Sequence, residues 1–311
     1  MTMPHSASHS VKLRALMNAQ CVGMPGAFNA LCGKLIADAG FEAAYISGAA
    51  TSVSAGVPDV GLLTAADFCR VIREVVDISG LPLIADADTG FGEAEMVRRT
   101  VIDYHRAGAA GLHIEDQKFP KRCGHLDGKE LIPLDHACEK VEWASKAARE
   151  LGDGSFIICA RTDARGVEGF DAAVKRAKAY IQAGADMIFP EGLGSESEFA
   201  QFASAMGRGP TPAADFPRTK LGGHAPYLLA NMTEFGKTPI LPLSSFASHG
   251  YSCVIWPVSL LRVAMGSVAA ALSHLKTDGS VNAVLDKMQT RAQLYQAVGY
   301  TPGTPWEART R

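Results

Sequence analysis

Short apolar runs alternate with amphipathic stretches along most of the chain. A helical pattern repeatedly ends in Ala-Gly, and an apolar run follows at once, as at residues 39–41, 107–109 and 183–185. Glycine just past a helix supplies a left-handed cap, and a short continuous apolar run fits a strand buried on both faces. The pattern predicts about eight strands, near residues 20–24, 43–47, 82–86, 110–115, 156–161, 186–190, 227–231 and 252–256.

The regular alternation of strand and helix indicates the fold class. Eight such units favour a closed (β/α)8 barrel of the TIM type over an open sheet. We expect a single domain over residues 1–311, with a flexible N-terminus over residues 1–10 and an extra C-terminal helix over about residues 280–298. Thr64, followed three residues later by Asp67, is expected to cap one of the helices.

Two segments break the alternation. Residues 116–133 are rich in Lys, Gly and Pro, and residues 205–224 are rich in Gly, Pro and Ala. Long segments without regular structure are often functional. We therefore predict that residues 116–133 form an active-site lid loop and that the second segment is a surface insertion.

Composition narrows the class of partner. Hydrophobic residues make up 47% of the chain and charged residues 20%, which suits a protein with a large buried core. The net charge is −2 and no run of Lys or Arg exceeds two residues, which disfavours nucleic acid and anionic membranes as partners. No apolar stretch approaches the ~20 residues that span a membrane. The seven cysteines are scattered without a CxxC pair, so we expect free thiols in a reducing, cytoplasmic compartment.

Polar residues follow the apolar runs at six strand ends. A carboxylate at a single strand end is often only a solvated cap. In a barrel, however, the carboxyl ends of the strands meet at one mouth, where active sites form. Six polar ends therefore predict an active site built from residues 45–48, 86–90, 113–116, 161–163, 191 and 231–234.

The end of the third predicted strand carries a candidate metal site. Asp86 and Asp88 lie two residues apart and can direct their carboxylates to the same side. This pair suits Mg2+, with Mn2+ as the alternative, because such a cation needs only one or two carboxylates and several waters. Asp59 and Glu115 are expected to complete an outer shell. The absence of Cys/His spacing disfavours zinc, and a carboxylate pair without metal is the competing interpretation.

One cysteine differs from the others in its neighbours. Cys123 lies in Lys121-Arg122-Cys123-Gly124-His125, and positive neighbours lower the pKa of a thiol towards neutrality. This context predicts a catalytic acid, whereas a small core residue is the competing interpretation and the better one for the other six cysteines. Arg161, His125 and Arg291 can hold carboxylates, so we expect a polycarboxylate substrate.

These motifs resemble the isocitrate lyase/phosphoenolpyruvate mutase superfamily, and within it the 2-methylisocitrate lyases, over about residues 11–300. The aspartate motif is shared across the superfamily, whereas the lysine, cysteine, glycine and histidine of the cysteine loop are specific to the lyase branch. The resemblance rests on Tyr45-Ile46-Ser47-Gly48, Asp86-Ala87-Asp88-Thr89-Gly90-Phe91-Gly92, His113-Ile114-Glu115-Asp116-Gln117, Lys121-Arg122-Cys123-Gly124-His125, Phe189-Pro190-Glu191, Asn231-Met232-Thr233-Glu234-Phe235-Gly236 and Met288-Gln289-Thr290-Arg291.

The resemblance implies an enzyme that uses Mg2+ to cleave the C2–C3 bond of 2-methylisocitrate to pyruvate and succinate, in propionate catabolism through the methylcitrate cycle. It implies a homotetramer whose C-terminal helices are swapped between subunits. It also implies three sets of site residues. The catalytic set is Cys123, Tyr45, Lys121 and His125; the metal set is Asp86, Asp88, Asp59 and Glu115; and the substrate-binding set is Ser47, Gly48, Gly124, Arg161, Glu191, Asn231, Thr233, Arg262 and Arg291.

Several alternatives stay open. Related short lyases act on dimethylmalate, other 2-alkylmalates, isocitrate or oxaloacetate, and one methyl group in a pocket is worth only ~1–3 kcal/mol. Ala49, where the family often has glycine, and a long segment at residues 207–221 leave substrate preference undecided. Phosphoryl transfer of the phosphoenolpyruvate mutase type is disfavoured by the cysteine loop. A catalytically silent barrel is disfavoured by the intact metal, cysteine and arginine positions.

Overall fold

The computed structural model describes residues 8–122, 124 and 128–306. Its strands are β1 (Val22–Pro25), β2 (Ala44–Ile46), β3 (Leu83–Asp86), β4 (Gly111–Glu115), β5 (Ile157–Thr162), β6 (Met187–Pro190), β7 (Tyr227–Asn231) and β8 (Cys253–Trp256). The helices around them are α1 (His9–Ala19), α2 (Ala30–Asp38), α3 (Gly48–Ser54), α4 (Ala65–Ser79), α5 (Ala94–Ala107), α6 (Leu134–Glu150), α7 (Ala164–Val167), α8 (Phe170–Ala183), α9 (Glu196–Ala205), α10 (Leu243–Ser248), α11 (Ser259–Asp278), η1 (Asn282–Lys287) and α12 (Arg291–Ala297).

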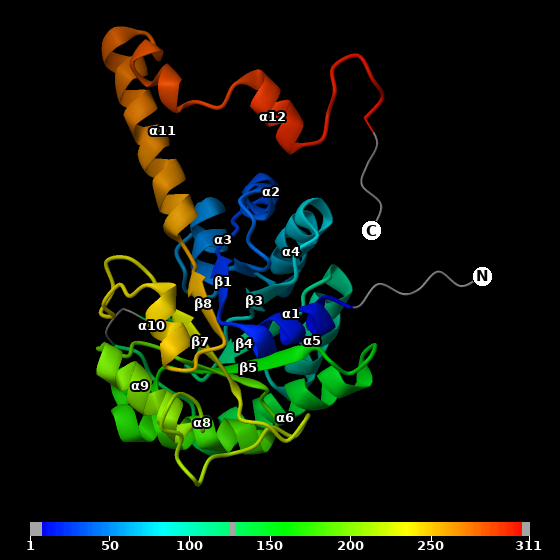
Figure 1. Cartoon of the computed structure of the whole chain (residues 1–311), viewed down its shortest axis with the longest axis vertical. Helices are drawn as coiled ribbons and strands as arrows, with labels where there is room; N and C mark the ends of the chain where they lie inside the picture. Colours follow the sequence, from blue (N-terminus) through cyan, green and yellow to red (C-terminus); the bar gives the residue numbers. More distant parts are fainter. Residues whose placement is uncertain (1–7, 123, 125–127, 307–311) are drawn as a thin grey trace, which may run out of the picture.

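The eight strands form one parallel sheet in the order β1-β8-β7-β6-β5-β4-β3-β2 (Figure 1). The ends of this sheet meet through a single bridge between Gly26 and Tyr45, where the Ala27 N–H donates to the Tyr45 carbonyl at 2.8 Å. A Cβ on Gly26 would lie 2.7 Å from the carbonyl carbon of Pro257, so only glycine fits at this seam. The predicted TIM-type barrel is confirmed, and each predicted strand overlaps an observed one.

The strands are buried on both faces, as their uninterrupted apolar runs predict. Ile84 of β3 packs into a cluster of side chains from several strands inside the barrel. Its neighbours Leu83 and Ala85 pack outward, in a second cluster with Phe68 of α4 and Tyr104 of α5. The alternation within one short strand fixes which residues face the barrel axis, and therefore which polar residues at the strand ends face the mouth.

One local prediction is confirmed and another agrees with the structure only in part. Thr64 and Asp67 form the expected capping box at the start of α4. Helix α1, however, begins at His9, inside the segment expected to be flexible, with its first turn capped by the Ser8 hydroxyl. The segment over residues 205–224 connects α9 to β7, so it lies at the end of the barrel opposite the strand carboxyl ends.

The prediction of a single helix over residues 280–298 is wrong. Two short helices, η1 and α12, take its place. Met288 leaves the helical conformation at φ −90° and ψ 143°, and Thr290 begins a new helix through a capping box with Gln293. Before them, α11 projects away from the barrel (Figure 1).

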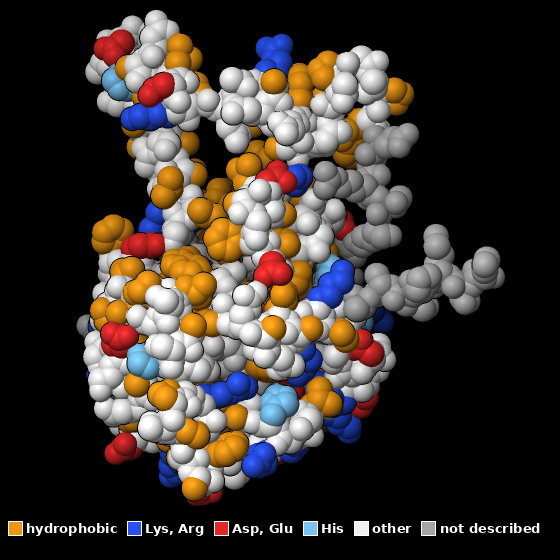
Figure 2. Space-filling model, in the orientation of Figure 1, with side chains coloured by type: hydrophobic (Ala, Val, Ile, Leu, Met, Phe, Trp, Pro, Cys, Tyr) orange, Lys and Arg blue, Asp and Glu red, His pale blue; other side chains and the backbone are white. Residues whose placement is uncertain are grey.

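Helix α11 carries an unusual number of apolar side chains on its surface. Val263, Val268 and Leu272 are each about half exposed or more. Figure 2 shows hydrophobic side chains gathered where α11 leaves the barrel. Within the part of the chain that the structure describes, none of the helices has the length and apolar character needed to cross a membrane.

A buried carboxylate ties together the end of the barrel opposite the mouth. Asp186, which precedes β6, accepts the Ile158 N–H at 3.0 Å and pairs with Arg14 of α1 at 3.1 Å and Arg149 of α6 at 2.5 Å. Its side chain is 1% exposed. One carboxylate therefore binds groups of β5, α1 and α6, which are distant from one another in sequence.

We expect Asp186→Ala to lower the free energy of unfolding by about 3–5 kcal/mol, because it leaves two partly buried guanidinium groups without their shared partner. Urea denaturation measures this loss. The matched control is Glu74→Ala, which breaks an exposed pair with Arg70 and should cost less than ~1 kcal/mol. Equal losses in the two variants would contradict the role given to Asp186.

Candidate active site

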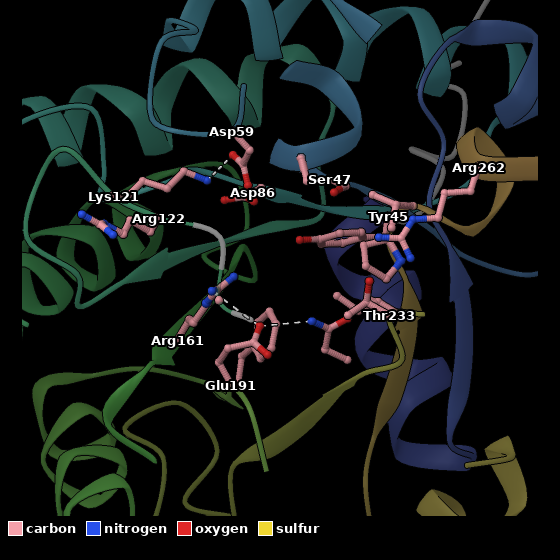
Figure 3. A pocket seen from close by; sticks show the side chains of 17 residues that line it. Tyr45, Ser47, Asp59, Asp86, Lys121, Arg122, Arg161, Glu191, Thr233 and Arg262 are labelled. Carbon is pink, nitrogen blue, oxygen red and sulfur yellow. Dashed lines mark hydrogen bonds and ion pairs between the residues drawn. The ribbon is translucent and has the colours of Figure 1, made fainter. Parts of the chain in front are cut away.

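A cavity opens at the carboxyl ends of the strands and gathers most of the predicted site residues (Figure 3). Its lining residues are Tyr45, Ser47, Ala49, Asp59, Asp86, Lys121, Arg122, Gly124, Arg161, Phe189, Glu191, Asn231, Thr233, Ile255, Pro257, Val258 and Arg262. Polar residues that are far apart in sequence thus meet at one mouth, as the barrel geometry requires.

The candidate metal residue Asp86 is held by main-chain donors. Its Oδ2 accepts the Gly48 N–H at 3.0 Å, and its Oδ1 accepts the Asp88 N–H at 2.9 Å. A Cβ on Gly48 would lie 2.5 Å from Oδ2, so glycine is required for this approach. Burial opposes a charge on Asp86, but the positive charges of His113, in its protonated form, and of Lys121 outweigh it and lower the pKa of the carboxyl. Asp86 is therefore a fixed carboxylate.

Lys121 reaches from the predicted lid segment to two of the predicted metal residues. Its ammonium pairs with Asp59 and lies 2.8 Å from Oδ1 of Asp88. Burial would lower the pKa of Lys121, but the surrounding carboxylates, led by Glu115, outweigh it and raise the pKa. Burial, together with the charge of neighbouring Asp86, raises the pKa of Asp88 to about 6.

The base of the lid segment is itself ordered. Gln117 and Leu131 form an antiparallel bridge, and the Lys118 N–H donates to the Glu130 carbonyl at 2.8 Å. The Gln117 side chain also binds the main chain of Arg122 in both directions, at 2.8 and 2.9 Å. These contacts explain how a long connection delivers Lys121 to a defined place.

The oxygen donors suit a hard divalent cation. Among the described residues, no group of three or more His, Cys, Asp or Glu side chains forms a complete metal cage. Mg2+ does not need one, since it is commonly held by one or two carboxylates with water and ligand oxygens. Asp86 and Asp88 supply such a pair. Glu115 is fully buried nearby, and neither of its carboxylate oxygens has a hydrogen-bond partner within the described structure.

Tyr45 contacts a histidine to which the sequence assigned no role. The Tyr45 hydroxyl lies 2.6 Å from Nε2 of His113, and the two rings stack with centroids 5.8 Å apart. Burial lowers the pKa of His113 to about 4, and burial followed by the charge of Asp86 raises the pKa of Tyr45. At neutral pH the pair is therefore an uncharged phenol beside an uncharged imidazole. The inward position of His113 on β4 is the only sequence signal for this pairing.

The opposite wall of the cavity is built around Arg161. Its Nε donates to Oδ2 of Asp163 at 3.0 Å, and one terminal nitrogen lies 3.5 Å from Oε2 of Glu191. The Asn231 amide donates to that same Glu191 oxygen at 3.1 Å. Arg161 also lies over the Phe189 ring at 5.0 Å from its centroid. Asp163 was part of a predicted strand end but had no predicted role.

The remaining predicted residues divide into three groups. Ser47 and Thr233 line the cavity, and Ser47 also caps α3 by accepting the Ala50 N–H at 3.2 Å. Arg262 lines the cavity while its guanidinium donates to Glu234 at 3.0 Å. Arg291 begins α12 and is exposed, outside the set of lining residues. Cys123 and His125 lie outside the described residues.

Gly124 approaches the Arg161 wall closely. A Cβ at this position would lie 2.6 Å from Cγ and 2.7 Å from the carboxyl carbon of Glu191, and closer still to the Arg161 guanidinium. The main chain of the lid segment thus contacts the polar wall directly.

Comparisons with known proteins agree with this geometry. The model of the phosphoenolpyruvate phosphomutase family matches residues 13–276. A probable 2-methylisocitrate lyase of Corynebacterium glutamicum is 45% identical, over 93% of this chain and 87% of the relative. The 2-methylisocitrate lyase of Bacillus subtilis is 42% identical, over 93% and 89%.

Solved structures of similar proteins share the fold of this chain. A 2,3-dimethylmalate lyase superposes with a TM-score of 0.82 at 33% identity, covering 94% of this chain and 92% of that one. An oxaloacetate acetylhydrolase bound to 3,3-difluorooxalacetate gives 0.83 at 30%, covering 93% of each. A phosphonopyruvate hydrolase with oxalate and Mg2+ gives 0.79 at 27%, covering 94% and 95%.

We expect Gly124→Ala to reduce kcat/KM by about 100-fold, because the added methyl group displaces the main chain from the Arg161 wall and such misplacement is costly. Steady-state kinetics measure the effect. Gly166→Ala is the control, since its Cβ would meet Lys129 only at 3.6 Å, an ordinary contact. Wild-type kinetics in Gly124→Ala would show that the contact is dispensable.

We also expect His113 to stay neutral down to about pH 4. An unfolded histidine takes up a proton near pH 6.5, so this group's contribution to stability is present above pH 6.5 and is lost as pH falls towards 4. The loss should reach about 3 kcal/mol, and His113→Gln should remove that part of the slope. Urea denaturation at several pH values tests this, and an imidazole NMR titration with a midpoint near 6.5 would refute it.

Proposed function

Because the chain belongs to the isocitrate lyase/phosphoenolpyruvate mutase superfamily and is a carbon–carbon lyase, we propose that it cleaves 2-methylisocitrate to pyruvate and succinate with Mg2+. The observation that carries the proposal is that Asp86 and Arg161 line one cavity, with Asp88 hydrogen-bonded to Asp86 through its main-chain N–H. Lys121, from the segment whose sequence contains Cys123, lines the same cavity. Relatives named 2-methylisocitrate lyase, which cover most of the chain, support the substrate.

Charge distribution suggests how the substrate lies. Mg2+ held by Asp86 and Asp88 would lower the pKa of the substrate hydroxyl and stabilise the alkoxide. On our proposal the Ser47 hydroxyl donates to the carboxylate of the pyruvate half, while Gly48, whose N–H is taken by Asp86, contacts that carboxylate without a side chain in the way. Arg161 binds a carboxylate of the succinate half through its guanidinium, and the neighbouring amide and hydroxyl groups of Asn231 and Thr233 complete that side.

The proposed reaction begins with loss of the proton from the C2 hydroxyl. Tyr45 can accept this proton on its phenol oxygen only while its own proton passes to Nε2 of His113, because the raised pKa disfavours a free phenolate. Electrons from the C2 oxygen then form the pyruvate carbonyl as the C2–C3 bond breaks. The bonding pair moves to C3 and spreads into the adjacent carboxylate as a succinate aci-carboxylate.

Protonation of C3 completes the bond changes, and the proton held by His113, whose pKa is lowered by burial, is then released so that the Cys123 thiolate is protonated again. We assign the proton to the Cys123 thiol, with Lys121 and His125 as its cationic and donor neighbours in sequence. Lys121 also balances the charge of Asp59 and Asp88, so its role joins the acid loop to the metal site. Water must be excluded while the carbanion exists, which is the proposed function of the lid segment.

Two further proposals concern the setting of the enzyme. An apolar groove between α2 and α11, lined by residues that include Phe28, Leu35 and Leu260, suits a homotetramer in which C-terminal helices are exchanged between subunits. Such exchange is how Arg291 would reach a cavity, and sedimentation of the purified protein tests it. The six described cysteines are free thiols, which suits a cytoplasmic enzyme of propionate catabolism.

The substrate proposal predicts that purified protein forms succinate and pyruvate from 2-methylisocitrate with Mg2+ and stops when the metal is chelated. Isocitrate, 2,3-dimethylmalate and oxaloacetate should give lower kcat/KM, and phosphonopyruvate should give no phosphoenolpyruvate. Chromatography of the products decides among these substrates. A higher kcat/KM for any of them would transfer the function to that substrate.

Cys123→Ser should reduce kcat by roughly 10²–10⁴-fold, the usual worth of a positioned proton donor. Metal and ligand binding should persist, as measured by calorimetry with oxalate. Cys138→Ser provides the control, because Cys138 is a half-buried thiol beside the apolar cluster of the α8 and α9 region. A fully active Cys123→Ser variant would remove the acid role.

A further inference from the structure

Two charged residues connect the Gly124 main chain to the substrate-binding arginine. The Lys129 ammonium donates to the Gly124 carbonyl and lies 2.7 Å from Oδ1 of Asp163. The same carboxylate accepts Nε and a terminal nitrogen of Arg161, at 3.0 and 3.2 Å. The side chains of Lys129 and Asp163 are 6% and 0% exposed, so water hardly competes for these contacts.

Asp163 is fixed from behind by a second carboxylate. Its N–H donates to Oδ1 of Asp116 at 2.9 Å, while the Thr162 and Tyr180 hydroxyls both donate to Oδ2 of Asp116 at 2.7 Å. Arg176 lies 3.5 Å from that oxygen. The main chain of Asp163 is therefore tied through Asp116 to β5 and α8. For this reason the Asp163 carboxylate, which joins Lys129 to Arg161, has little freedom to move.

Gly124 is held from two directions. Lys129 binds its carbonyl oxygen, and Glu191 and Arg161 pack so closely against its Cα that no side chain fits there. Since the peptide bond joins Gly124 to Cys123, the position of Gly124 limits where the proposed acid can reach. Arg161 is in turn the residue proposed to hold the half of the substrate that receives the proton.

We propose that Asp163 and Lys129 are positioning residues, which lock the Gly124 main chain and the Arg161 guanidinium into one unit and so align the proton donor with the substrate. This inference rests on the proposed lyase function for its effect on turnover. The contact itself does not depend on which substrate is used. A purely structural ion pair would stabilise the fold without controlling Gly124.

The first test removes the ammonium and keeps the length of the side chain. Lys129→Met leaves Asp163 paired with Arg161, so the fold should persist with a melting temperature close to that of the wild type. Hydrogen exchange followed by mass spectrometry should show about tenfold faster exchange confined to peptides that contain Gly124. With 2-methylisocitrate, kcat should fall by about 10- to 100-fold and KM should change less.

The matched control is Lys118→Met. Lys118 lies in the same segment but pairs with Glu130 at 3.1 Å while 63% exposed. This variant should exchange and turn over like the wild type. Lys129→Arg, which retains a cation and a donor, should recover a large part of kcat, as a positioning contact would and a change in global stability would not.

A second arm tests whether both residues act through the same contact. Asp163→Asn preserves shape but removes the charge shared by Lys129 and Arg161, so it should also lower kcat. If both act on the Gly124–Arg161 unit, the double variant should be little worse than the poorer single variant, because coupled contacts are not additive. Fully additive losses would overturn the proposed unit.

The outcomes separate this inference from the substrate proposal. Unchanged exchange at Gly124 in Lys129→Met overturns the positioning contact, whatever the activity. Faster exchange with wild-type turnover overturns its catalytic importance. Failure of the wild-type protein to cleave 2-methylisocitrate contradicts the proposed function alone, since the exchange measurement, and kcat on whichever substrate is cleaved, still decide the role of Lys129.

Discussion

The charge balance at the barrel mouth is the constraint on which the site depends. Several carboxylates converge there, and taking even one ion out of water costs several kcal/mol unless a partner compensates. Lys121 and Arg161 are two buried cations that do so, one on each side of the cavity. Burial raises the pKa of Glu115, and the charges of Arg161 and Lys121 oppose that rise without cancelling it. A divalent cation at the mouth would add to their effect and favour the charged form of the carboxylates.

The two cations come from different kinds of structure. Arg161 belongs to β5 and is placed by the barrel itself, whereas Lys121 belongs to a long connection. The connection is therefore part of the site's electrostatics. Removing it from the mouth would leave Asp59 and Asp88 without their shared ammonium, so the order of the segment and the charge state of the carboxylates depend on each other.

The fold was largely predictable from sequence because local signals agree with the global one. Glycine caps mark the helix ends, and continuous apolar runs mark the strands, so the positions of the strand ends followed. The polar residues at the strand ends were found by the same logic, whereas Arg262 and Arg291 entered the expected site through the family resemblance. The cap that interrupts residues 280–298 was present in the sequence as Thr290 and Gln293, but the helical pattern around it outweighed it.

Specific pairings were not predictable, because they depend on which side chains meet across the barrel. The sequence places His113 on the inward side of its strand but not against Tyr45, and nothing in it says that Lys121 pairs with Asp59 from 62 positions away. Asp163 was visible only as a polar residue at a strand end. One of its cationic partners, Lys129, lies in the lid segment, and the other, Arg161, lies in β5. No sequence pattern relates these two segments.

The seam of the barrel gives Tyr45 a double function. Its main chain forms the single bridge that joins β2 to the start of the circle, and its side chain stands in the cavity against His113. The joint of the sheet that rests on a single bridge is thus also the support of the phenol. Thermal opening of the barrel there would tilt the ring and lengthen its contact with the imidazole. The stiffness of the seam at Gly26 and the geometry of the proposed proton relay are consequently linked.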